Sequence, residues 1–248
     1  MNNFIEDLFS LKGKVAIVTG GSKGIGRQIS EALARAGAEV YAIGRSKGNK
    51  TQLKGVTYCS CDITKKNTFK SLCKKIIKEK GKIDILFNSA GISLESNNKN
   101  MQEIFRTTIE TNLIATFNCC QVVSELMLES GVIVNVSSIG SKVGFPGNPG
   151  YVSSKGGIMQ LTKALAIDYS KKNIRVNSLV PGYMRTDMTK KSYENTKEKK
   201  ERLNNMIIKR WGKPQDLIGA AIFLCSDASS YMTGAELIID GGWLSKGL

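Results

Sequence analysis

Short apolar runs recur along the chain, and most are followed by a stretch whose apolar residues have helical spacing. The runs predict strands at residues 14–19, 39–43, 56–61, 83–87, 131–136, 175–180 and 235–239. The helical spacing predicts helices at residues 27–36, 68–79, 104–128, 151–169 and 215–224. This alternation favours an α/β fold with a parallel sheet covered on both faces. Residues 1–248 show no repeat or linker, so we expect a single domain.

Two connections depart from the alternation. Residues 44–56 are short and polar, so a full crossover helix is not expected there. Residues 186–205 are rich in charge and predict a mobile helical flap. Pro181 and Gly182 break the strand that precedes this flap.

The chain contains no histidine in its 248 residues. Ser-His-Asp and Cys-His nucleophilic catalysis, and zinc sites built on histidine, are therefore excluded in their usual forms. None of the six cysteines forms a Cys-x-x-Cys pair, and most of them fall in apolar patterns. We therefore expect small buried thiols in a reducing, cytoplasmic compartment, and no metal site.

The formal net charge is +15, which raises nucleic-acid binding as one hypothesis. Aromatic residues that could stack on bases do not interleave with the lysines, so solvated helix faces are the preferred interpretation and no nucleic-acid partner is expected. A positive field would still attract an anionic cofactor or substrate. No apolar run approaches membrane-spanning length, and residues 1–7 lack the apolar core of a signal peptide, so no membrane partner is expected.

A glycine-rich turn joins the first predicted strand to the first predicted helix. Glycines allow the backbone to approach a pyrophosphate closely, and a helix N-terminus presents free N–H groups to that anion. The spacing is Gly-x-x-x-Gly-x-Gly rather than Gly-x-Gly-x-x-Gly, but the strand and the helix that give such a turn its meaning are both predicted. We expect a dinucleotide to contact Gly20, Ser22, Lys23, Gly24, Ile25 and Gly26.

The end of the second predicted strand indicates which dinucleotide binds. A site that prefers NAD would place Asp or Glu there to accept hydrogen bonds from the ribose hydroxyls. This chain has Gly44, followed by Arg45 and Ser46. Arg45 can bind a 2′-phosphate with its guanidinium fork, and Lys23 can add a second cation. Two cations without a carboxylate favour NADP over NAD.

A second group of candidate residues follows the strand at 131–136. Ser138 lies where this strand ends, and Tyr151 and Lys155 lie four residues apart at the start of a predicted helix. This spacing places the phenol and the ammonium on one helix face. We expect the nearby cation to lower the pKa of Tyr151, which would allow the phenol to transfer a proton near neutral pH.

Together these residues resemble the short-chain dehydrogenase/reductases. The matching pieces are Thr19–Gly26, Asp62, Asn88–Gly91, Asn112, Ser138, Tyr151–Lys155 and Pro181–Gly182, in the order and spacing of that family. Ser89 stands where the family pattern has a second Asn. The resemblance implies a single Rossmann-like domain with a doubly wound parallel sheet, a homotetramer, and an NAD(P)-dependent oxidoreductase that acts on a CH–OH group.

The resemblance also implies roles for individual residues. Tyr151 would be the general acid or base, Lys155 would lower its pKa and bind the nicotinamide ribose, and Ser138 would donate to the substrate oxygen. Asn112 would distort its helix locally and hold a water that feeds a proton relay to Lys155. Asp62 would bond the adenine amino group, and the flap after Thr186 would close over the substrate. The other expected cofactor contacts are Ile63, Asn88, Ala90, Gly91, Pro181, Gly182, Met184 and Thr186.

The choice of substrate rests on a narrower resemblance. Residues 8–15, 181–189, 210–219 and 240–243 are similar to those of gluconate 5-dehydrogenases and 2-deoxy-gluconate 3-dehydrogenases. A sugar acid or polyol of carbohydrate metabolism is therefore the first hypothesis, with Arg185 or a flap lysine as partner for a carboxylate.

Two alternatives to a sugar acid remain open. One is reduction of a 3-oxoacyl group on acyl carrier protein, an acidic partner that needs basic docking residues. Lys172 fits such docking, whereas Glu125 and Glu129 oppose it. The other alternative is a non-catalytic NADP-binding regulator. The presence of Ser138, Tyr151 and Lys155 opposes that second alternative.

Overall fold

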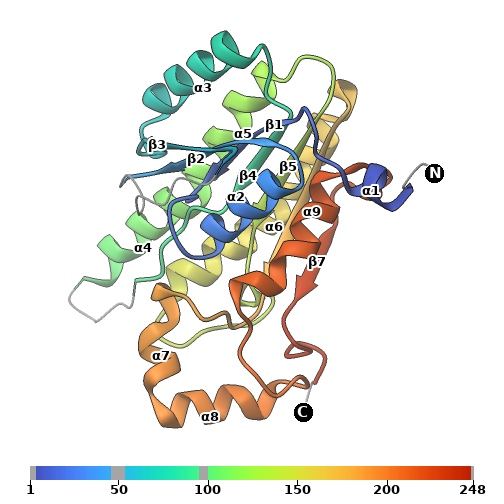
Figure 1. Ribbon diagram of the computed structural model, residues 1–248. Helices are drawn as coiled ribbons and strands as arrows, with labels where there is room; N and C mark the ends of the chain where they lie inside the picture. The colour runs from blue at the N-terminus through green and yellow to red at the C-terminus, as the bar shows by residue number, and fades with distance from the viewer. Residues whose placement is uncertain (1–3, 46–53, 95–99, 247–248) are drawn as a thin grey trace.

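The computed structural model describes residues 4–45, 54–94 and 100–246 (Figure 1). Within these ranges the strands form one seven-stranded sheet in the order β3-β2-β1-β4-β5-β6-β7, and each neighbouring pair is parallel. The prediction of a doubly wound, Rossmann-like parallel sheet is therefore confirmed. The strands are β1 (Val15–Thr19), β2 (Glu39–Gly44), β3 (Val56–Ser60), β4 (Ile85–Asn88), β5 (Gly131–Val136), β6 (Ile174–Pro181) and β7 (Glu236–Ile239).

Helices cover both faces of the sheet, because alternate residues of each buried strand point to opposite sides. Ile17 packs with α3 residues such as Phe69, whereas the next residue, Val18, packs with α2 residues such as Leu33. Helices α3, α5 and α6 thus share one face, and α2 and α9 share the other. The helices on these faces are α2 (Gly24–Arg35), α3 (Lys66–Lys80), α4 (Met101–Ile109), α5 (Ala115–Leu126), α6 (Pro149–Asp168) and α9 (Ile218–Cys225).

The long helix predicted at residues 104–128 is not continuous. Helix α4 passes into a π-helical segment, Glu110–Ile114, before α5 begins at Ala115. π-Helical turns inside longer helices frequently mark functional sites. The apolar spacing conceals this break, because the chain remains helical throughout.

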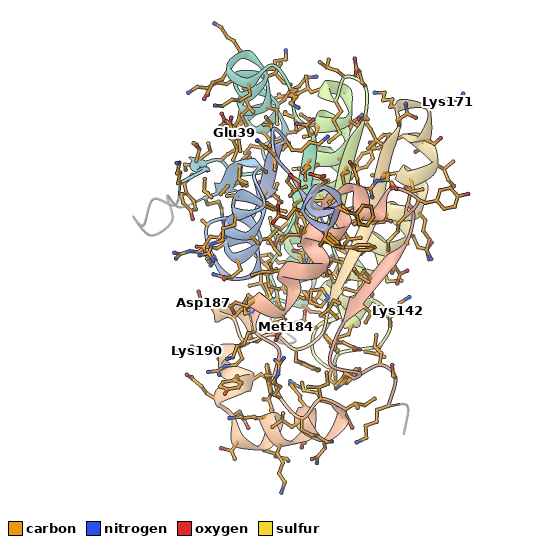
Figure 2. All side chains as sticks on the ribbon, turned by 45° about the vertical axis from the view of Figure 1, so that its right-hand side comes forward. Glu39, Lys142, Lys171, Met184, Asp187 and Lys190 are labelled. Carbon is orange, nitrogen blue, oxygen red and sulfur yellow. The ribbon has the colours of Figure 1, made fainter. Side chains whose placement is uncertain are left out.

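The flap leaves the sheet after β6. Residues 186–205 are helical as predicted, in a short 3₁₀ turn followed by α7 (Lys190–Glu194) and α8 (Thr196–Asn205). Both helices lie beyond the carboxyl edge of the strands in Figure 1. Figure 2 shows Met184, Asp187 and Lys190 along the junction between the sheet and these helices.

Three smaller points complete the comparison with the sequence. Helix α1 (Phe4–Phe9) was not predicted. The connection at 44–56 falls largely on residues 46–53, which lie outside the described ranges. All six cysteines are described and carry free thiols; Cys59 is half-buried and the others are buried, in agreement with the expectation of small buried thiols.

The structure also bears on membranes and metals. None of the helices in the described ranges combines the length and the apolar composition that crossing a membrane requires. The same ranges contain no cluster of three or more cysteine or acidic side chains able to hold a metal ion.

Candidate active site

A cleft of about 1430 Å³ opens at the carboxyl edge of the sheet. This is the edge at which open α/β sheets bind their ligands. Its wall brings together most of the residues predicted from the sequence: Gly20, Ser22, Lys23, Gly24, Ile25, Gly26, Arg45, Asp62, Ile63, Ala90, Gly91, Ser138, Tyr151, Lys155, Pro181, Gly182, Met184 and Thr186. Ser46 lies outside the described residues. Asn88 and Asn112 are buried and do not belong to the described wall.

The glycine-rich turn is tightly packed at one end of the cleft. Gly20 has φ +68°, and a Cβ there would lie 2.8 Å from the backbone of Ala90. A Cβ at Gly26 would collide with the carbonyl oxygen of Gly20. Helix α2 begins at Gly24, and within the described residues no side chain caps its first N–H groups. Those N–H groups are therefore available to an anion in the cleft.

The part of the cleft next to β2 and β3 carries cations and one oriented carboxylate. Lys23 and Arg45 line it and are exposed, and β2 ends at Gly44 rather than at an acidic residue. Asp62 Oδ1 accepts hydrogen bonds from the backbone N of Thr64 at 3.0 Å and from its hydroxyl at 2.8 Å. These hydrogen bonds lower the pKa of Asp62, so this carboxylate is ionised at neutral pH.

Ser138 and Tyr151 meet at the centre of the cleft. Ser138 follows β5, and its Oγ accepts a hydrogen bond from the backbone N of Gly140 at 3.1 Å. Tyr151 lies in the first turn of α6, which begins at Pro149, where the fixed φ of proline suits a helix start. Burial raises the pKa of the Tyr151 phenol, and the interaction with the Ser138 hydroxyl offsets part of this rise.

Lys155 differs from the expectation drawn from its spacing. Its ammonium Nζ donates to the carbonyl oxygen of Val136 at 2.8 Å and lies 5.7 Å from the centroid of the Tyr151 ring. Burial, rather than the charge of Lys155, has the largest effect on the pKa of Tyr151. Burial raises this pKa, and the Ser138 hydroxyl opposes the rise. The predicted lowering of the Tyr151 pKa toward neutrality is therefore wrong for this arrangement. Burial also lowers the pKa of Lys155 to about 8.

Asn112 is buried in the π-helical segment and reaches out of its own helix. Its Nδ2 donates to the carbonyl oxygen of Ile92 at 2.9 Å and to Ser154 Oγ at 3.1 Å, and its Oδ1 accepts from the backbone N of Ile92 at 2.8 Å. The side chain thus fixes the loop after β4 against α6. The expected local distortion of the helix at Asn112 is present.

Asn88 braces the sheet behind the cleft. Its Nδ2 donates to Asn135 Oδ1 at 3.0 Å, and its Oδ1 accepts from the Thr19 hydroxyl at 3.4 Å. These hydrogen bonds tie together the ends of β1, β4 and β5. The Asn88 side chain does not line the cleft, and a contact between this residue and the cofactor stays a prediction. The side chain satisfies buried neighbours instead.

Aromatic residues that were given no role in the sequence line up beyond Tyr151. Phe145 stacks with Tyr151 at 6.3 Å between ring centroids and with Tyr183 at 6.1 Å. Phe145 lies in the glycine-rich loop between Ser138 and Tyr151, and Tyr183 follows Pro181 and Gly182 directly. The signal in the sequence was an aromatic residue beside a family motif: Phe145 near Tyr151, and Tyr183 directly after Pro181 and Gly182.

Arg185 does not face the catalytic residues, although it was expected to meet a substrate carboxylate. Its guanidinium lies over the Tyr193 ring, 4.1 Å from the centroid. It lines a separate hollow of about 360 Å³ between α2 and residues 213–215. A cation on the substrate side must therefore come from another position.

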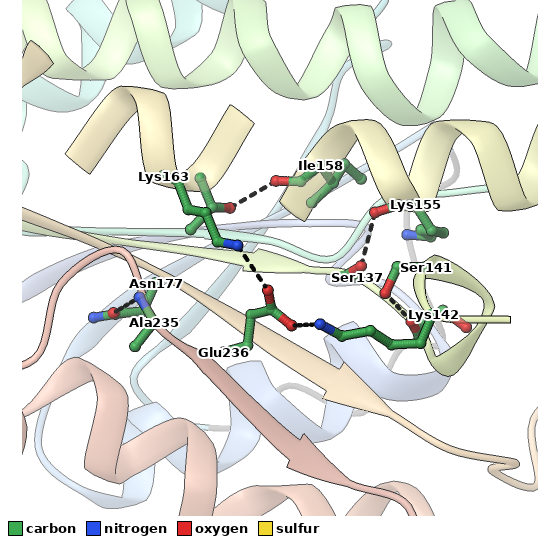
Figure 3. Close-up of polar contacts among 11 residues, drawn as sticks. Ser137, Ser141, Lys142, Lys155, Ile158, Lys163, Asn177, Ala235 and Glu236 are labelled. Atoms are coloured by element: carbon green, nitrogen blue, oxygen red, sulfur yellow. Dashed lines mark hydrogen bonds and ion pairs between the residues drawn. The ribbon is translucent and has the colours of Figure 1, made fainter. Parts of the chain in front are cut away.

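An ion-pair cluster holds the loop that carries Phe145 (Figure 3). Glu236 of β7 pairs with Lys142 at 2.7 Å and with Lys163 of α6 at 3.6 Å, and its side chain is only 12% exposed. One carboxylate thus joins the edge strand, the loop after Ser138 and the helix of Tyr151. This contact restrains the loop beside the catalytic side chains.

Comparison with known proteins decides the family. Residues 20–244 match the family model described as enoyl-(acyl carrier protein) reductase. This chain is a short-chain dehydrogenase/reductase. The family predicted from the motifs is confirmed, and the protein is an oxidoreductase that uses a nicotinamide cofactor.

Relatives within the short-chain dehydrogenase/reductases divide between two substrate classes. The 3-oxoacyl-(acyl-carrier-protein) reductase FabG of Chlamydia muridarum is 39% identical over 245 residues, which cover 94% of this chain and 98% of that protein. The 2-dehydro-3-deoxy-D-gluconate 5-dehydrogenase of Dickeya dadantii is 34% identical over 256 residues, covering 98% and 100%. The structure of a gluconate 5-dehydrogenase from Burkholderia cenocepacia in complex with NADP and tartrate superimposes with a TM-score of 0.92 at 29% identity, covering 97% and 99%.

The cleft of this short-chain dehydrogenase/reductase fits a dinucleotide. The uncapped start of α2 suits a pyrophosphate, and Lys23 and Arg45 lie at the adenosine end. Ser138, Tyr151 and Lys155 lie at the wall where the reacting carbon would be placed. The fit rests on the chemistry of these groups and on their order along the cleft.

Proposed function

We propose that this enzyme interconverts a secondary alcohol and a ketone on a sugar acid, with NADP as its cofactor. The observation that carries the proposal is that one cleft brings these groups together. Lys23, Arg45 and the uncapped N-terminus of α2 line the same cleft as Ser138, Tyr151 and Lys155. The nicotinamide supplies or accepts a hydride when it is bound.

The chain's own residues handle the proton and the oxygen of the substrate. In the reducing direction Tyr151 donates its phenolic proton to the carbonyl oxygen, and in the oxidising direction the phenolate accepts it. The Ser138 hydroxyl donates to the same oxygen and stabilises its developing charge. Lys155 holds a positive charge beside the Tyr151 ring, and Asn112 fixes the neighbouring loop. The raised pKa of Tyr151 suits a proton donor in reduction.

The preference for NADP is supported by two features. Lys23 and Arg45 line the part of the cleft expected to hold the adenosine. In the described residues, β2 ends at Gly44 and is followed by Arg45 rather than by a carboxylate. A guanidinium binds a phosphate as a bidentate fork. The superimposed Burkholderia cenocepacia enzyme contains NADP.

The sugar-acid substrate is supported by the relatives named for gluconate derivatives and by the tartrate bound to the Burkholderia enzyme. The alternative is reduction of a 3-oxoacyl thioester, which the similarity to the Chlamydia enzyme favours. Lys172, the residue expected to dock an acidic carrier, donates to the carbonyl oxygen of Ser124 at 3.0 Å. It therefore stabilises the end of α5, and Glu125 beside it would repel an acidic partner.

A spectrophotometric panel tests the proposal. NADPH and NADH oxidation would be followed with 5-ketogluconate, a 3-deoxy-hexulosonate-type ketone, a neutral ketose and an acetoacetyl thioester. We expect turnover of a keto-sugar acid with NADPH to exceed that of the other substrates. Turnover confined to the thioester would show that the substrate is a 3-oxoacyl thioester and not a sugar acid. No turnover of any carbonyl would favour a non-catalytic NADP-binding regulator.

We further propose a cytoplasmic homotetramer of carbohydrate metabolism. Large apolar side chains are exposed along α4 and α5 outside the cleft, including Met101 and Phe117. Exposed apolar surface of this kind marks contact faces between subunits. Light scattering coupled to gel filtration measures the assembly, and a monomer would contradict it.

A further inference from the structure

Building on the function proposed above, we propose that Arg202 of the flap helix α8 binds the carboxylate of the substrate. Arg202 would thereby make the enzyme prefer acidic sugars over neutral ones. Its guanidinium connects to the catalytic tyrosine through two aromatic rings, Tyr183 and Phe145.

The guanidinium of Arg202 is oriented by three contacts and retains free donors. Its Nε donates to Ser192 Oγ at 2.8 Å, Nη1 to the Tyr183 hydroxyl at 3.5 Å, and Nη2 to Glu198 Oε2 at 2.9 Å. Because each terminal nitrogen carries two N–H groups, one remains on each. These two donors are available to a carboxylate. The Arg202 side chain is 28% exposed, so it is partly shielded yet reachable.

The aromatic wall leads from Arg202 to the reaction centre. The guanidinium lies 4.7 Å from the centroid of the Tyr183 ring. Tyr183 stacks with Phe145, which stacks with Tyr151. The phenol of Tyr183 is also close enough to Tyr151 to influence it electrostatically. Tyr183 lies between Gly182 and Met184, which both line the cleft. The proposed substrate has its carbonyl oxygen at Tyr151 and extends past these residues, with its acid end toward Arg202.

Hydrogen-bond donors exceed acceptors around Tyr183. Trp211 and Trp243 pack against its ring at 5.4 and 5.8 Å between centroids. Both indole N–H groups are buried, and within the described residues neither has an acceptor. An unpaired buried donor is energetically unfavourable. A hydroxy acid, which is rich in acceptor oxygens, is chemically complementary to such a region.

The other flap cations point elsewhere. Arg185 and Lys199 both lie over the Tyr193 ring, at 4.1 and 4.3 Å from its centroid. Lys190 pairs with Glu194 at 3.8 Å on the exposed side of α7. Unlike these three cations, Arg202 contacts Tyr183, the ring that connects through Phe145 to Tyr151.

The test compares Arg202→Met with wild type at saturating NADPH, on 5-ketogluconate and on its neutral amide. Loss of a hydrogen-bonded ion pair worth about 1.5–3 kcal/mol corresponds to a roughly 10–150-fold rise in KM for the acid. KM for the amide should change by less than about twofold, which also shows that the variant is folded. Arg202→Lys should recover part of the affinity, since it keeps the charge but not the fork.

Lys199→Met is the matched control, because Lys199 lies on the same helix and also contacts an aromatic ring. It should leave the ratio of acid to amide KM unchanged. An Arg202→Met variant with the wild-type ratio would overturn the inference.

If wild type reduces no keto acid, the proposed function fails. The role of Arg202 is then tested separately, by calorimetry of D-gluconate binding to the enzyme–NADP complex. Weaker binding in Arg202→Met supports the inference. Equal binding, or no binding to wild type, rejects it.

Discussion

Asn112 and Ile92 are joined by two hydrogen bonds that run in opposite directions. The Asn112 amide donates to the carbonyl oxygen of Ile92 at 2.9 Å and accepts from its backbone N at 2.8 Å. A side chain in a π-helical turn thus replaces the backbone partner that a neighbouring strand would supply. This amide therefore helps to hold the loop after β4, which lines the cleft.

We expect Asn112→Ala to lower the free energy of unfolding by about 3 kcal/mol, because buried backbone groups of Ile92 lose their partners. NADPH should also bind more weakly, since the loop lines the cleft. Urea unfolding and fluorescence titration measure the two effects. Thr108→Val is the control. The Thr108 hydroxyl donates to the carbonyl oxygen of Ile104 in its own helix at 2.7 Å, and its loss should cost less than about 1 kcal/mol. Equal effects for both variants would contradict the bracing role.

Tyr151→Phe should reduce kcat by about 10²–10⁴-fold, because it removes the proton donor and leaves the ring in place. NADPH affinity, measured by fluorescence, should stay within about twofold of wild type. Tyr183→Phe removes a hydroxyl from the neighbouring ring and should reduce kcat far less. Full activity of Tyr151→Phe would show that another group transfers the proton.

Arg45→Asp should move cofactor preference toward NAD. The loss of a charge-assisted contact to the 2′-phosphate corresponds to a roughly 10–100-fold rise in KM for NADPH, while the new carboxylate can accept from the ribose hydroxyls of NADH. Lys23→Met should raise KM for NADPH without lowering KM for NADH. Steady-state kinetics with both cofactors measures this, and an unchanged NADPH/NADH ratio for Arg45→Asp would show that Arg45 does not contact the phosphate.

Lys155 should oppose folding at neutral pH. Burial lowers its pKa from 10.5 to about 8, so below pH 8 the folded protein holds a charge that it disfavours. Between about pH 8 and 10.5 the unfolded chain binds more protons than the folded one, and stability rises with pH through this window. Lys155→Met should be inactive yet more stable at pH 7, by about 3 kcal/mol.

Urea unfolding at several pH values measures the effect of Lys155. Below pH 8, the difference in unfolding free energy between wild type and Lys155→Met should stay constant. From about pH 8 to 10.5 this difference should narrow, because the wild type gains stability. A gap that stays constant across this window would contradict the lowered pKa.

The strands and the cofactor turn could be predicted because their signals are local. Buried parallel strands are continuous apolar runs, and the packing of Gly20 against Ala90 leaves no room for a side chain. The pKa of Tyr151 could not be predicted from its spacing to Lys155. Spacing shows which residues are neighbours on a helix, whereas the ammonium turns to Val136 and burial dominates the phenol.

Contacts between segments that lie far apart in the chain also could not be predicted from the sequence. Arg202 lies nineteen residues from Tyr183, and its place over that ring depends on how α8 folds back. Asn88 fits the family pattern of a cofactor loop, yet its amide is taken up by Asn135 and Thr19. Both outcomes depend on tertiary packing, which a linear pattern does not encode.

Helices α7 and α8, all of whose residues are described, contribute no buried side chain. Most substitutions on such a surface change the folding free energy by no more than about 0.5 kcal/mol. Ser138 and Lys155, by contrast, are buried among the packed strands and helices. With the proposed role of Arg202, single changes on the flap would alter which substrates are accepted while the variants still fold and keep Ser138, Tyr151 and Lys155 in place. Specificity would then evolve separately from catalysis.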